Sequence, residues 1–216
     1  MSNHLNKLDR PLAARQRRSE LTTDRLLHAA EDILRERGAD AASLRAIAEK
    51  AGMSIGIVYR RFPDKDAVLR SVYMRFFERV NLGNRRALAN VTLERATTIE
   101  ILTAIVRGIA EGYRRHRGLL RALVLYVRTH PDAMFRKRAM KMNAAAYQGM
   151  DRILKPRGRD IKHPRPHVAI PFAISGIATM LQERIIFSDV AARPVISDDD
   201  LIAEATHMLA SYLCYK

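Results

Sequence analysis

A short segment near the amino terminus gathers side chains that could make specific polar contacts. The segment AGMSIGIVYRRF, residues 51–62, contains a tyrosine and two adjacent arginines and is followed by Pro63. Arginine can donate two hydrogen bonds to O6 and N7 of guanine, whereas a tyrosine hydroxyl or a lysine, such as Lys65, is suited to phosphate oxygens. We therefore expect this segment to contact duplex DNA.

Two short helices must position these side chains. Ser43 can cap a helix that ends at Gly52, and Ser54 can cap a second helix that stops near Phe62, because Pro63 disfavours helical geometry for the residue before it. Short helices joined by a glycine-containing turn indicate a helix-turn-helix. Met53, Val58 and Phe62 are then expected to point inward. The residues expected to face outward are Ser54, Ile55, Gly56, Ile57, Tyr59, Arg60 and Arg61.

The spacing of these residues is similar to that of a known family. Residues 22–77 resemble the DNA-binding domain of the TetR family of bacterial transcriptional regulators. The matching residues are the SLRAIAEKAG stretch, Gly52, Ser54, Val58, Tyr59, Phe62, Lys65 and Leu69. The resemblance implies an operator-binding protein, and it covers about a quarter of the chain.

The resemblance also implies a role for individual residues. Arg45 matches a position that can reach a base, and Ser43 one that caps its helix and touches phosphate. Tyr59 and Lys65 match phosphate contacts. The stretch from Ile55 to Ile57 matches the variable base-reading positions, which are Ile55, Gly56 and Ile57.

Two departures from the family pattern affect the operator sequence. Arg61 stands where the family more often has histidine or tyrosine, and Ile55 and Ile57 replace commoner polar residues. Isoleucine can contact the methyl group of thymine, so we expect apolar contacts to carry more of the base readout here.

Apolar residues recur with the helical period in almost every long segment, which predicts an all-α fold of about nine helices. The first helix is expected from Thr22–Asp24, whose oxygens could cap it, to Gly38, and the fourth from Asp64. Residues 82–96 are polar and are expected to form a junction. The later helices are expected at about 97–116, 118–130, 132–155, 166–188 and 198–215.

We divide the chain into a basic flexible arm (residues 1–20), a helix-turn-helix DNA-binding domain (21–66) and a larger helical domain for effector binding and dimerisation (67–216). The arm could be a disordered tail or a tether for DNA phosphates. The chain of 216 residues has a formal net charge of +15, which favours anionic partners, although the basic residues look diffusely spread.

The last two expected helices are candidates for a dimer interface, because a protein that reads both halves of an operator needs two recognition helices about 34 Å apart. The resemblance to the TetR family implies the same, since its members pair their last two long helices into a four-helix bundle. The same apolar residues would also suit the core of a monomer. The expected interface residues are Ile174, Ile177, Leu181, Leu201, Ile202, Ala205, Leu209 and Tyr212.

The middle helices are expected to enclose an effector, because apolar pockets with a few polar groups are the usual ligand sites. The basic stretch 113–121 could attract an anionic ligand or could be a solvated helix end. The residues expected to line the pocket are Phe77, Ile109, Tyr113, Tyr126, Met134, Tyr147, Met150 and Thr179.

Other classes find less support. The histidines are scattered, and the sequence contains no phosphate-binding loop or nucleophile elbow. We therefore expect that the protein is not an enzyme and that it binds no cofactor or metal. The sequence has a single cysteine, Cys214, and no secretory signal, which favours a cytoplasmic protein. The apolar stretch Val168–Leu181 is too short to cross a membrane. A basic helical protein that binds nucleic acid without sequence preference remains the alternative.

Overall fold

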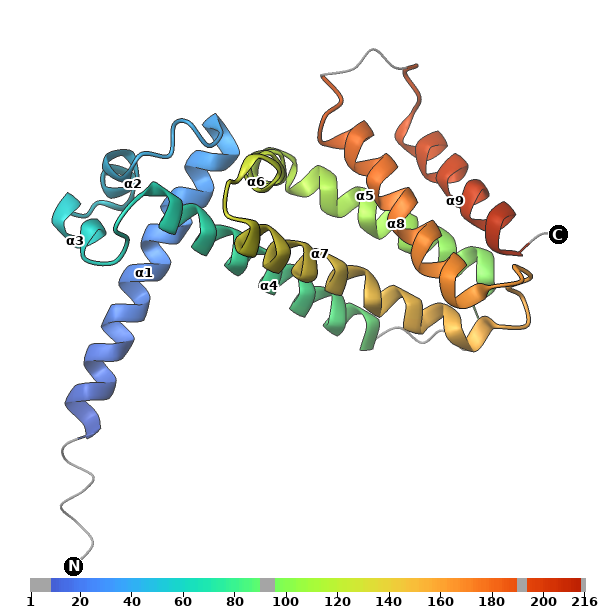
Figure 1. Cartoon of the computed structure of the whole chain (residues 1–216), viewed down its shortest axis with the longest axis horizontal. Coiled ribbons are helices and arrows are strands. Elements are labelled where there is room, and N and C mark those ends of the chain that lie inside the picture. The colour runs from blue at the N-terminus through green and yellow to red at the C-terminus, as the bar shows by residue number, and fades with distance from the viewer. Residues whose placement is uncertain (1–8, 90–95, 190–193, 215–216) are drawn as a thin grey trace, which may run out of the picture. The chain divides into compact units, whose positions relative to one another are not determined.

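The structure is a computed structural model that describes residues 9–89, 96–189 and 194–214. Every regular element in these ranges is a helix, which confirms the all-α class (Figure 1). The helices are α1 (Asp9–Arg37), α2 (Leu44–Ala51), α3 (Ile55–Tyr59), α4 (Lys65–Ala89), α5 (Thr98–Arg115), α6 (Arg117–Thr129), α7 (Ala133–Leu154), the 3-10 helix η1 (Lys155–Arg157), α8 (Pro166–Ile185) and α9 (Asp198–Cys214).

The chain forms two compact units, Met1–Tyr73 and Met74–Lys216, and the boundary between them falls inside α4. In the first unit α2 packs against α1 and α3. In the second unit α5, α8 and α9 pack against one another, and α7 lies against α8. The helix-turn-helix and the larger helical part therefore have separate cores.

The first helix begins earlier than its expected start near Thr22. Residues 9–20 belong to α1, so this part of the expected flexible arm is helical, and residues 1–8 lie outside the described ranges. Thr22 and Thr23 do not cap the helix, because each hydroxyl donates to the carbonyl four residues earlier. The preceding stretch of alanine, glutamine and arginine consists of good helix formers, which allows α1 to extend.

The expected junction at residues 82–96 is also partly helical, since α4 continues to Ala89. Residues 90–95 lie outside the described ranges. The next helix starts close to where the sequence predicts, after a capping box in which Thr97 accepts a hydrogen bond from the backbone of Glu100 and Glu100 accepts one from the backbone of Thr97. The carboxylate of Glu100 accepts hydrogen bonds from the amide and the hydroxyl of Thr97, and these bonds hold the pKa of Glu100 below its usual value.

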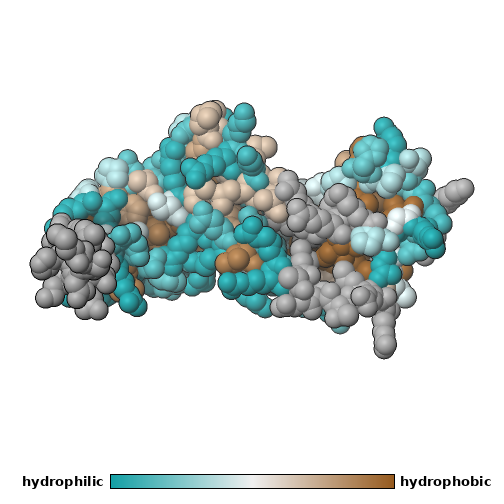
Figure 2. Space-filling model, turned by 90° about the horizontal axis from the view of Figure 1, so that it is seen from below, coloured by the Kyte–Doolittle hydropathy of each residue, from teal (hydrophilic) through white to brown (hydrophobic). Residues whose placement is uncertain are grey.

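The core of the second unit lies between α5, α8 and α9. Leu102, Val106, Ala169 and Leu181 have almost no exposed surface there. Hydrophilic residues dominate the face shown in Figure 2, and hydrophobic residues appear on it as separate patches. None of the helices in the described ranges is long and apolar enough to cross a bilayer.

Candidate DNA-binding surface

The first short helix of the motif is capped as the sequence predicts. Ser43 lies at the N-cap of α2 and its Oγ accepts a hydrogen bond from the amide of Ala46 at 3.1 Å. Ile47 and Ala48 are buried, whereas the side chain of Arg45 is exposed on the opposite side. The helix is therefore anchored by its apolar face and presents Arg45 to solvent.

The turn after α2 depends on a glycine in the left-handed region. Gly52 has a φ of 63°, a conformation that costs an L-residue with a side chain roughly 1–2 kcal/mol. The amide of Met53 donates to the carbonyl of Ala48 at 2.9 Å and the amide of Gly52 to that of Glu49 at 3.0 Å, which closes the helix end. This turn sets the direction in which the chain enters α3.

Arg25 in α1 also holds this turn, and the sequence analysis missed it. Its Nη2 donates to the carbonyl of Ala51 at 3.0 Å, although the two residues are far apart in the sequence. A cation at a helix C-terminus is stabilising, because the last carbonyls have no partner within the helix. No local pattern around Arg25 could have revealed this contact.

The second helix of the motif, α3, contains only Ile55–Tyr59 and is shorter than expected. Val58 is fully buried and Phe62 is nearly so, which anchors the helix and the chain after it; Met53, also expected to point inward, is half-buried. Ser54 lies at the N-cap but makes no side-chain capping hydrogen bond among the described residues. The amides of Arg61 and Phe62 both donate to the carbonyl of Val58, so the helix tightens and ends before Pro63.

The outward face of α3 carries most of the side chains that were expected there. Ser54, Gly56 and Arg60 are exposed, as are Ile55 (41% exposed) and Tyr59 (59% exposed). Ile57 is half-buried, so it offers less surface to a partner than Ile55 does. Ile55 and Tyr59 thus place an apolar and an aromatic side chain on the exposed face of this short helix.

Two exposed arginines flank this face without an acidic partner. Neither Arg45 nor Arg60 forms an ion pair or a side-chain hydrogen bond with the residues that the structure describes. In contrast, Lys50 on the same motif pairs with Glu36 at 3.1 Å. Arg45 and Arg60 therefore keep their hydrogen-bond donors available for an anion or for a base edge.

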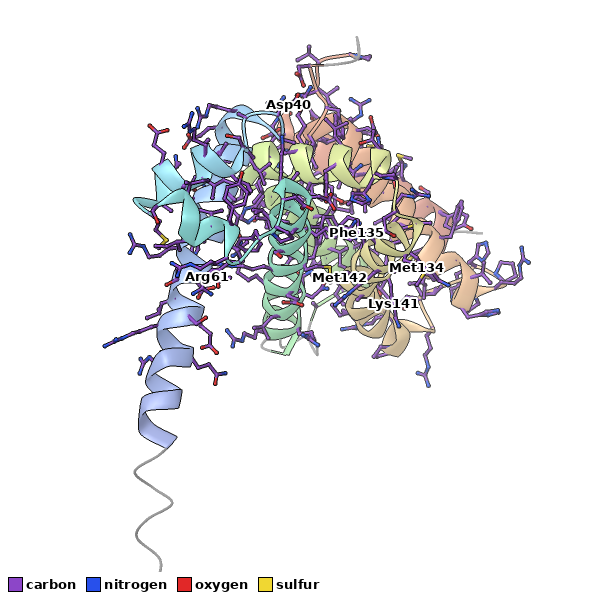
Figure 3. All side chains as sticks on the ribbon, turned by 60° about the vertical axis from the view of Figure 1, so that its left-hand side comes forward. Asp40, Arg61, Met134, Phe135, Lys141 and Met142 are labelled. Atoms are coloured by element: carbon purple, nitrogen blue, oxygen red, sulfur yellow. The ribbon has the colours of Figure 1, made fainter. Side chains whose placement is uncertain are left out.

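Arg61 is placed differently from the position that the sequence predicts. Its Nη1 donates to Ser19 Oγ and to Thr23 Oγ1, each at 2.9 Å, and the side chain is only partly exposed (Figure 3). Ser19 and Thr23 lie one helical turn apart on α1, so they offer two acceptors to one guanidinium. Arg61 thus joins the end of the motif to α1 in place of the expected outward orientation.

Lys65, the expected phosphate contact, lies at the first residue of α4. Its Nζ donates to the carbonyl of Asp40 over a long 3.3 Å, and its side chain is half-buried. The preceding Asp64 caps α4 by accepting from the amide of Ala67 at 2.7 Å. The ammonium has three donors, so a weak bond to one carbonyl leaves capacity for a phosphate oxygen.

The expected effector-pocket residues differ in their exposure. Ile109 is buried in the core between α5, α8 and α9, whereas Met134 is 74% exposed and Thr179 is exposed on α8. Helical spacing marks apolar positions but does not say which of them face a common space. Tyr147 and Met150 lie on α7, and their side chains are not among those that the structure describes.

The remaining three expected pocket residues are partly buried. The ring of Phe77 packs edge-on against Phe76 at 5.1 Å between centroids, and Tyr126 packs against His130 at 5.0 Å. Tyr113 lies against the margin of the core of the second unit. Each of the three keeps part of its surface exposed.

The expected dimer-interface residues are nearly all internal, which corrects that prediction. Only Tyr212, at 40% exposed, reaches the surface. The sequence could not separate the two faces of α8, because this helix is apolar on almost every side and one side packs on α5. The seven buried members are Ile174, Ile177, Leu181, Leu201, Ile202, Ala205 and Leu209.

Three of the four arginines in the basic stretch 113–121 form ion pairs. Arg114 pairs with Asp198 at 2.7 Å, and Arg121 and Arg117 both pair with Asp189. The hydrogen bond from Arg121 holds the pKa of Asp189 below its usual value. These arginines connect α5 and α6 to the chain after α8, and this contact was not expected from the sequence.

Comparison with known proteins agrees with the helix-turn-helix geometry. Residues 26–72 match the family model described as bacterial regulatory proteins, tetR family. The transcriptional repressor KstR of Mycolicibacterium smegmatis is 39% identical over 75 residues, which cover 35% of this chain and 34% of KstR. The transcriptional activator FasR of the same organism is 30% identical over 112 residues, 49% of this chain and 51% of FasR. The chain thus spans a third to a half of these relatives.

The fold of the whole chain is similar to that of solved structures. A regulatory protein of the tetR family from Rhodococcus RHA1 covers 90% of this chain and 98% of its own length, with a TM-score of 0.66 and 16% identity. FadR from Bacillus subtilis, in complex with stearoyl-CoA, covers 89% and 98%, with a TM-score of 0.64 and 17% identity. The family-model match lies on α1 to α4, where the motif geometry is found, so residues 26–72 are similar to the DNA-binding region of bacterial regulatory proteins of the tetR family.

Proposed function

We propose that the chain is a transcriptional regulator that binds a pseudo-palindromic DNA operator as a homodimer and is released from it by a small-molecule effector. The observation that carries this proposal is the exposed face of α3 beside Arg45 and Arg60, which form no ion pair with the described residues. A helix of this size, anchored by Val58 and exposed on its other side, suits the major groove, which is about 12 Å wide. The first unit would bind DNA, and the second would bind the effector and dimerise.

The side chains of the motif take different roles in this proposal. Arg45 and Arg60 contact base edges, while Tyr59 and Lys65 contact phosphates. Ile55 is the more exposed of the two isoleucines, so it is the candidate for contact with a thymine methyl group. These roles separate residues that set the sequence preference from residues that set the overall affinity.

Three further motif residues act through geometry. Ser43 orients the start of α2 and can also contact a phosphate of the DNA. Gly56 lets α3 approach the groove closely because it has no side chain. Arg61 positions the recognition helix through α1, since its guanidinium is already bound to the hydroxyls of Ser19 and Thr23.

We propose that the dimer forms through the outward faces of α8 and α9. Phe172 is 65% exposed, Met208 is 55% exposed, and the ring of Tyr212 lies 6.0 Å from that of Phe172. A side chain added at Gly176 would meet nothing within 4 Å in this chain, so this glycine leaves room for a partner helix. Exposed apolar side chains gathered on two neighbouring helices are typical of an interface.

The effector is proposed to bind within the second unit. Phe77, Tyr113 and Tyr126 remain candidates to contact it, since each is only partly buried. The structure of FadR holds stearoyl-CoA, so a long-chain acyl-CoA is the first effector class to test. The effector must bind the DNA-released conformation more tightly than the DNA-bound one, because equal binding would leave the equilibrium unchanged.

The operator is the measurement that tests this function. Duplexes selected by the purified protein from a random pool should contain an inverted repeat, and fluorescence anisotropy should give a dissociation constant at least about a thousandfold lower for that repeat than for a scrambled duplex. Arg45→Ala and Arg60→Ala should weaken operator binding and relax its sequence preference, whereas Lys65→Ala should weaken all duplexes alike. Equal affinity for all sequences would support the alternative, a basic helical protein without sequence preference.

Effector release is tested on the same operator. Stearoyl-CoA, followed by shorter acyl-CoA esters and free fatty acids, is titrated against the protein–operator complex, and release at micromolar concentrations is expected from one class only.

We further propose that the protein is cytoplasmic and not an enzyme, in keeping with the regulators that it resembles. Within the described ranges, no group of three or more metal-binding side chains occurs.

A further inference from the structure

The exposed side of α7 carries cations without acids beside them. Residues 133–150, the first eighteen of this helix, contain four lysines and arginines and no aspartate or glutamate. Lys137, Arg138 and Lys141 are exposed, and we call these three residues the α7 basic face. Figure 3 labels Lys141 and, at the start of the same helix, Met134.

The α7 basic face differs from the other basic cluster of the second unit in its pairing. On α6, Arg117 and Arg121 pair with Asp189, and Arg128 lies 3.4 Å from Glu183. None of the three cations of the α7 basic face forms an ion pair or a hydrogen bond through its side chain with the residues that the structure describes. Their charge is not cancelled locally, so it remains available to an external polyanion.

The excess charge of the chain is concentrated in this region, in contrast to the diffuse distribution that the sequence seemed to indicate. Residues 133–165 contain ten lysines and arginines and two aspartates, which is a net charge of +8 out of +15. The helix-turn-helix, residues 43–65, has five lysines and arginines and two acids. Further exposed cations follow α7 in the loop, at Arg159, Lys162 and Arg165.

The shape and composition of the face favour one kind of partner. A second copy of this chain would bring the same positive charge, and a single small anion would need donors that converge, which an open helix face does not provide. A membrane anchor would need bulky apolar residues such as leucine, phenylalanine or tryptophan, but among the side chains described on α7 the exposed apolar ones are methionines and alanines. Duplex DNA offers a continuous row of phosphates with one charge per roughly 1.7 Å of axis.

We propose that the α7 basic face is a second DNA-binding surface, which contacts the phosphates of duplex DNA independently of sequence and separately from α3. The proposal rests on the proposed function for the identity of the polyanion. Such a surface would raise the affinity for any duplex and the rate of encounter with DNA, because phosphate contacts release counterions and steer association. It would not contribute to the choice of operator.

The test uses the full-length protein and a random-sequence duplex at several salt concentrations. The double variant Lys137→Gln/Lys141→Gln removes two phosphate contacts, so the slope of log affinity against log salt should become shallower by about 1.8. Between 50 and 200 mM salt the loss of affinity should then be about twelvefold smaller than in the unaltered protein. The charge-preserving variant Lys137→Arg/Lys141→Arg should restore the original slope.

A matched control removes the same charge from another exposed helix face. Arg107 and Arg115 on α5 are exposed and make no ion pair with the described residues, so Arg107→Gln/Arg115→Gln should leave the slope nearly unchanged. An unchanged slope in the α7 variant would overturn the proposal, and so would equal changes in both double variants. The protein could instead co-sediment with phosphatidylglycerol vesicles. If the α7 variant abolished this co-sedimentation and left the salt dependence of DNA binding unaltered, the proposal would be overturned in favour of a lipid surface.

The same measurements separate this inference from the proposed function. Arg45→Ala should reduce operator preference and keep the α7-dependent slope on random duplex. If no operator can be selected but the slope still depends on Lys137 and Lys141, the second surface stands and the proposed function fails. If an operator is found and the slope does not depend on these lysines, the reverse holds.

Discussion

The contact between Arg61 and α1 makes a prediction that separates positioning from DNA contact. The change is Arg61→Gln, compared with the double variant Ser19→Ala/Thr23→Val, which removes both acceptors but keeps the arginine. Two hydrogen bonds of 2.9 Å join these groups. If Arg61 acts through α1, either change should displace the end of the recognition helix in the same way.

The size of the effect follows from the bonds. A hydrogen bond to a charged group contributes roughly 1.5–3 kcal/mol when buried, and partial exposure reduces this to about 1 kcal/mol for each bond. Each variant should therefore lower the free energy of unfolding by about 2 kcal/mol, measured by urea titration with circular dichroism. Combining Arg61→Gln with the α1 double variant should add little, because the second change removes a contact that the first has already broken.

Operator affinity, measured for the single variants and for their combination, is the decisive measurement in this double-mutant cycle. Positioning predicts that Arg61→Gln weakens operator binding in the unaltered protein but has little effect once the hydroxyls of Ser19 and Thr23 are gone. Thr22→Val is the matched control, because the Thr22 hydroxyl donates to the carbonyl of Arg18 and is not bonded to Arg61. If Arg61→Gln weakens binding by the same factor with and without the α1 hydroxyls, the arginine contacts DNA directly and our assignment is wrong.

Three further predictions follow from the structure. Gly52→Ala should destabilise the first unit by about 1 kcal/mol in urea unfolding, because the φ of Gly52 is 63°. Crowding is not the cause, since the nearest atom to an added side chain is 4.0 Å away. Gly56→Ala should instead stabilise α3 by about 0.5–1 kcal/mol, and equal effects of the two variants would contradict the backbone argument. The pKa of Asp189 is lowered by Arg121, so its contribution to stability is present above its unfolded pKa and is lost as pH falls through its folded pKa; Asp189→Asn should remove part of the acid dependence of unfolding, and an unchanged pH profile would contradict this. Phe172→Glu should convert the dimer to a monomer in sedimentation velocity without unfolding it, since the residue is 65% exposed, and a stable dimer in this variant would place the interface elsewhere.

The sequence was sufficient to predict the motif because its signals are local. Ser43 and Gly52 mark the two ends of α2 through their own backbone requirements, and Pro63 limits α3 through its ring. The later helices follow from the 3.6-residue period of apolar positions, and their observed ends lie within a few residues of those expected. The start of α1 was missed because its threonine hydroxyls bond within the helix, which their residue type does not reveal.

The sequence by itself determined where most of the helices and the DNA-binding motif lie, because caps, turns and periodicity depend on residues a few positions apart. Only the tertiary structure decided the direction of the long side chains and the outward face of each helix. Arg61 reaches α1, Arg117 and Arg121 meet Asp189 after α8, and the three cations of the α7 basic face meet no acid among the described residues. These outcomes depend on distances between segments remote in sequence, and no local pattern encodes such distances.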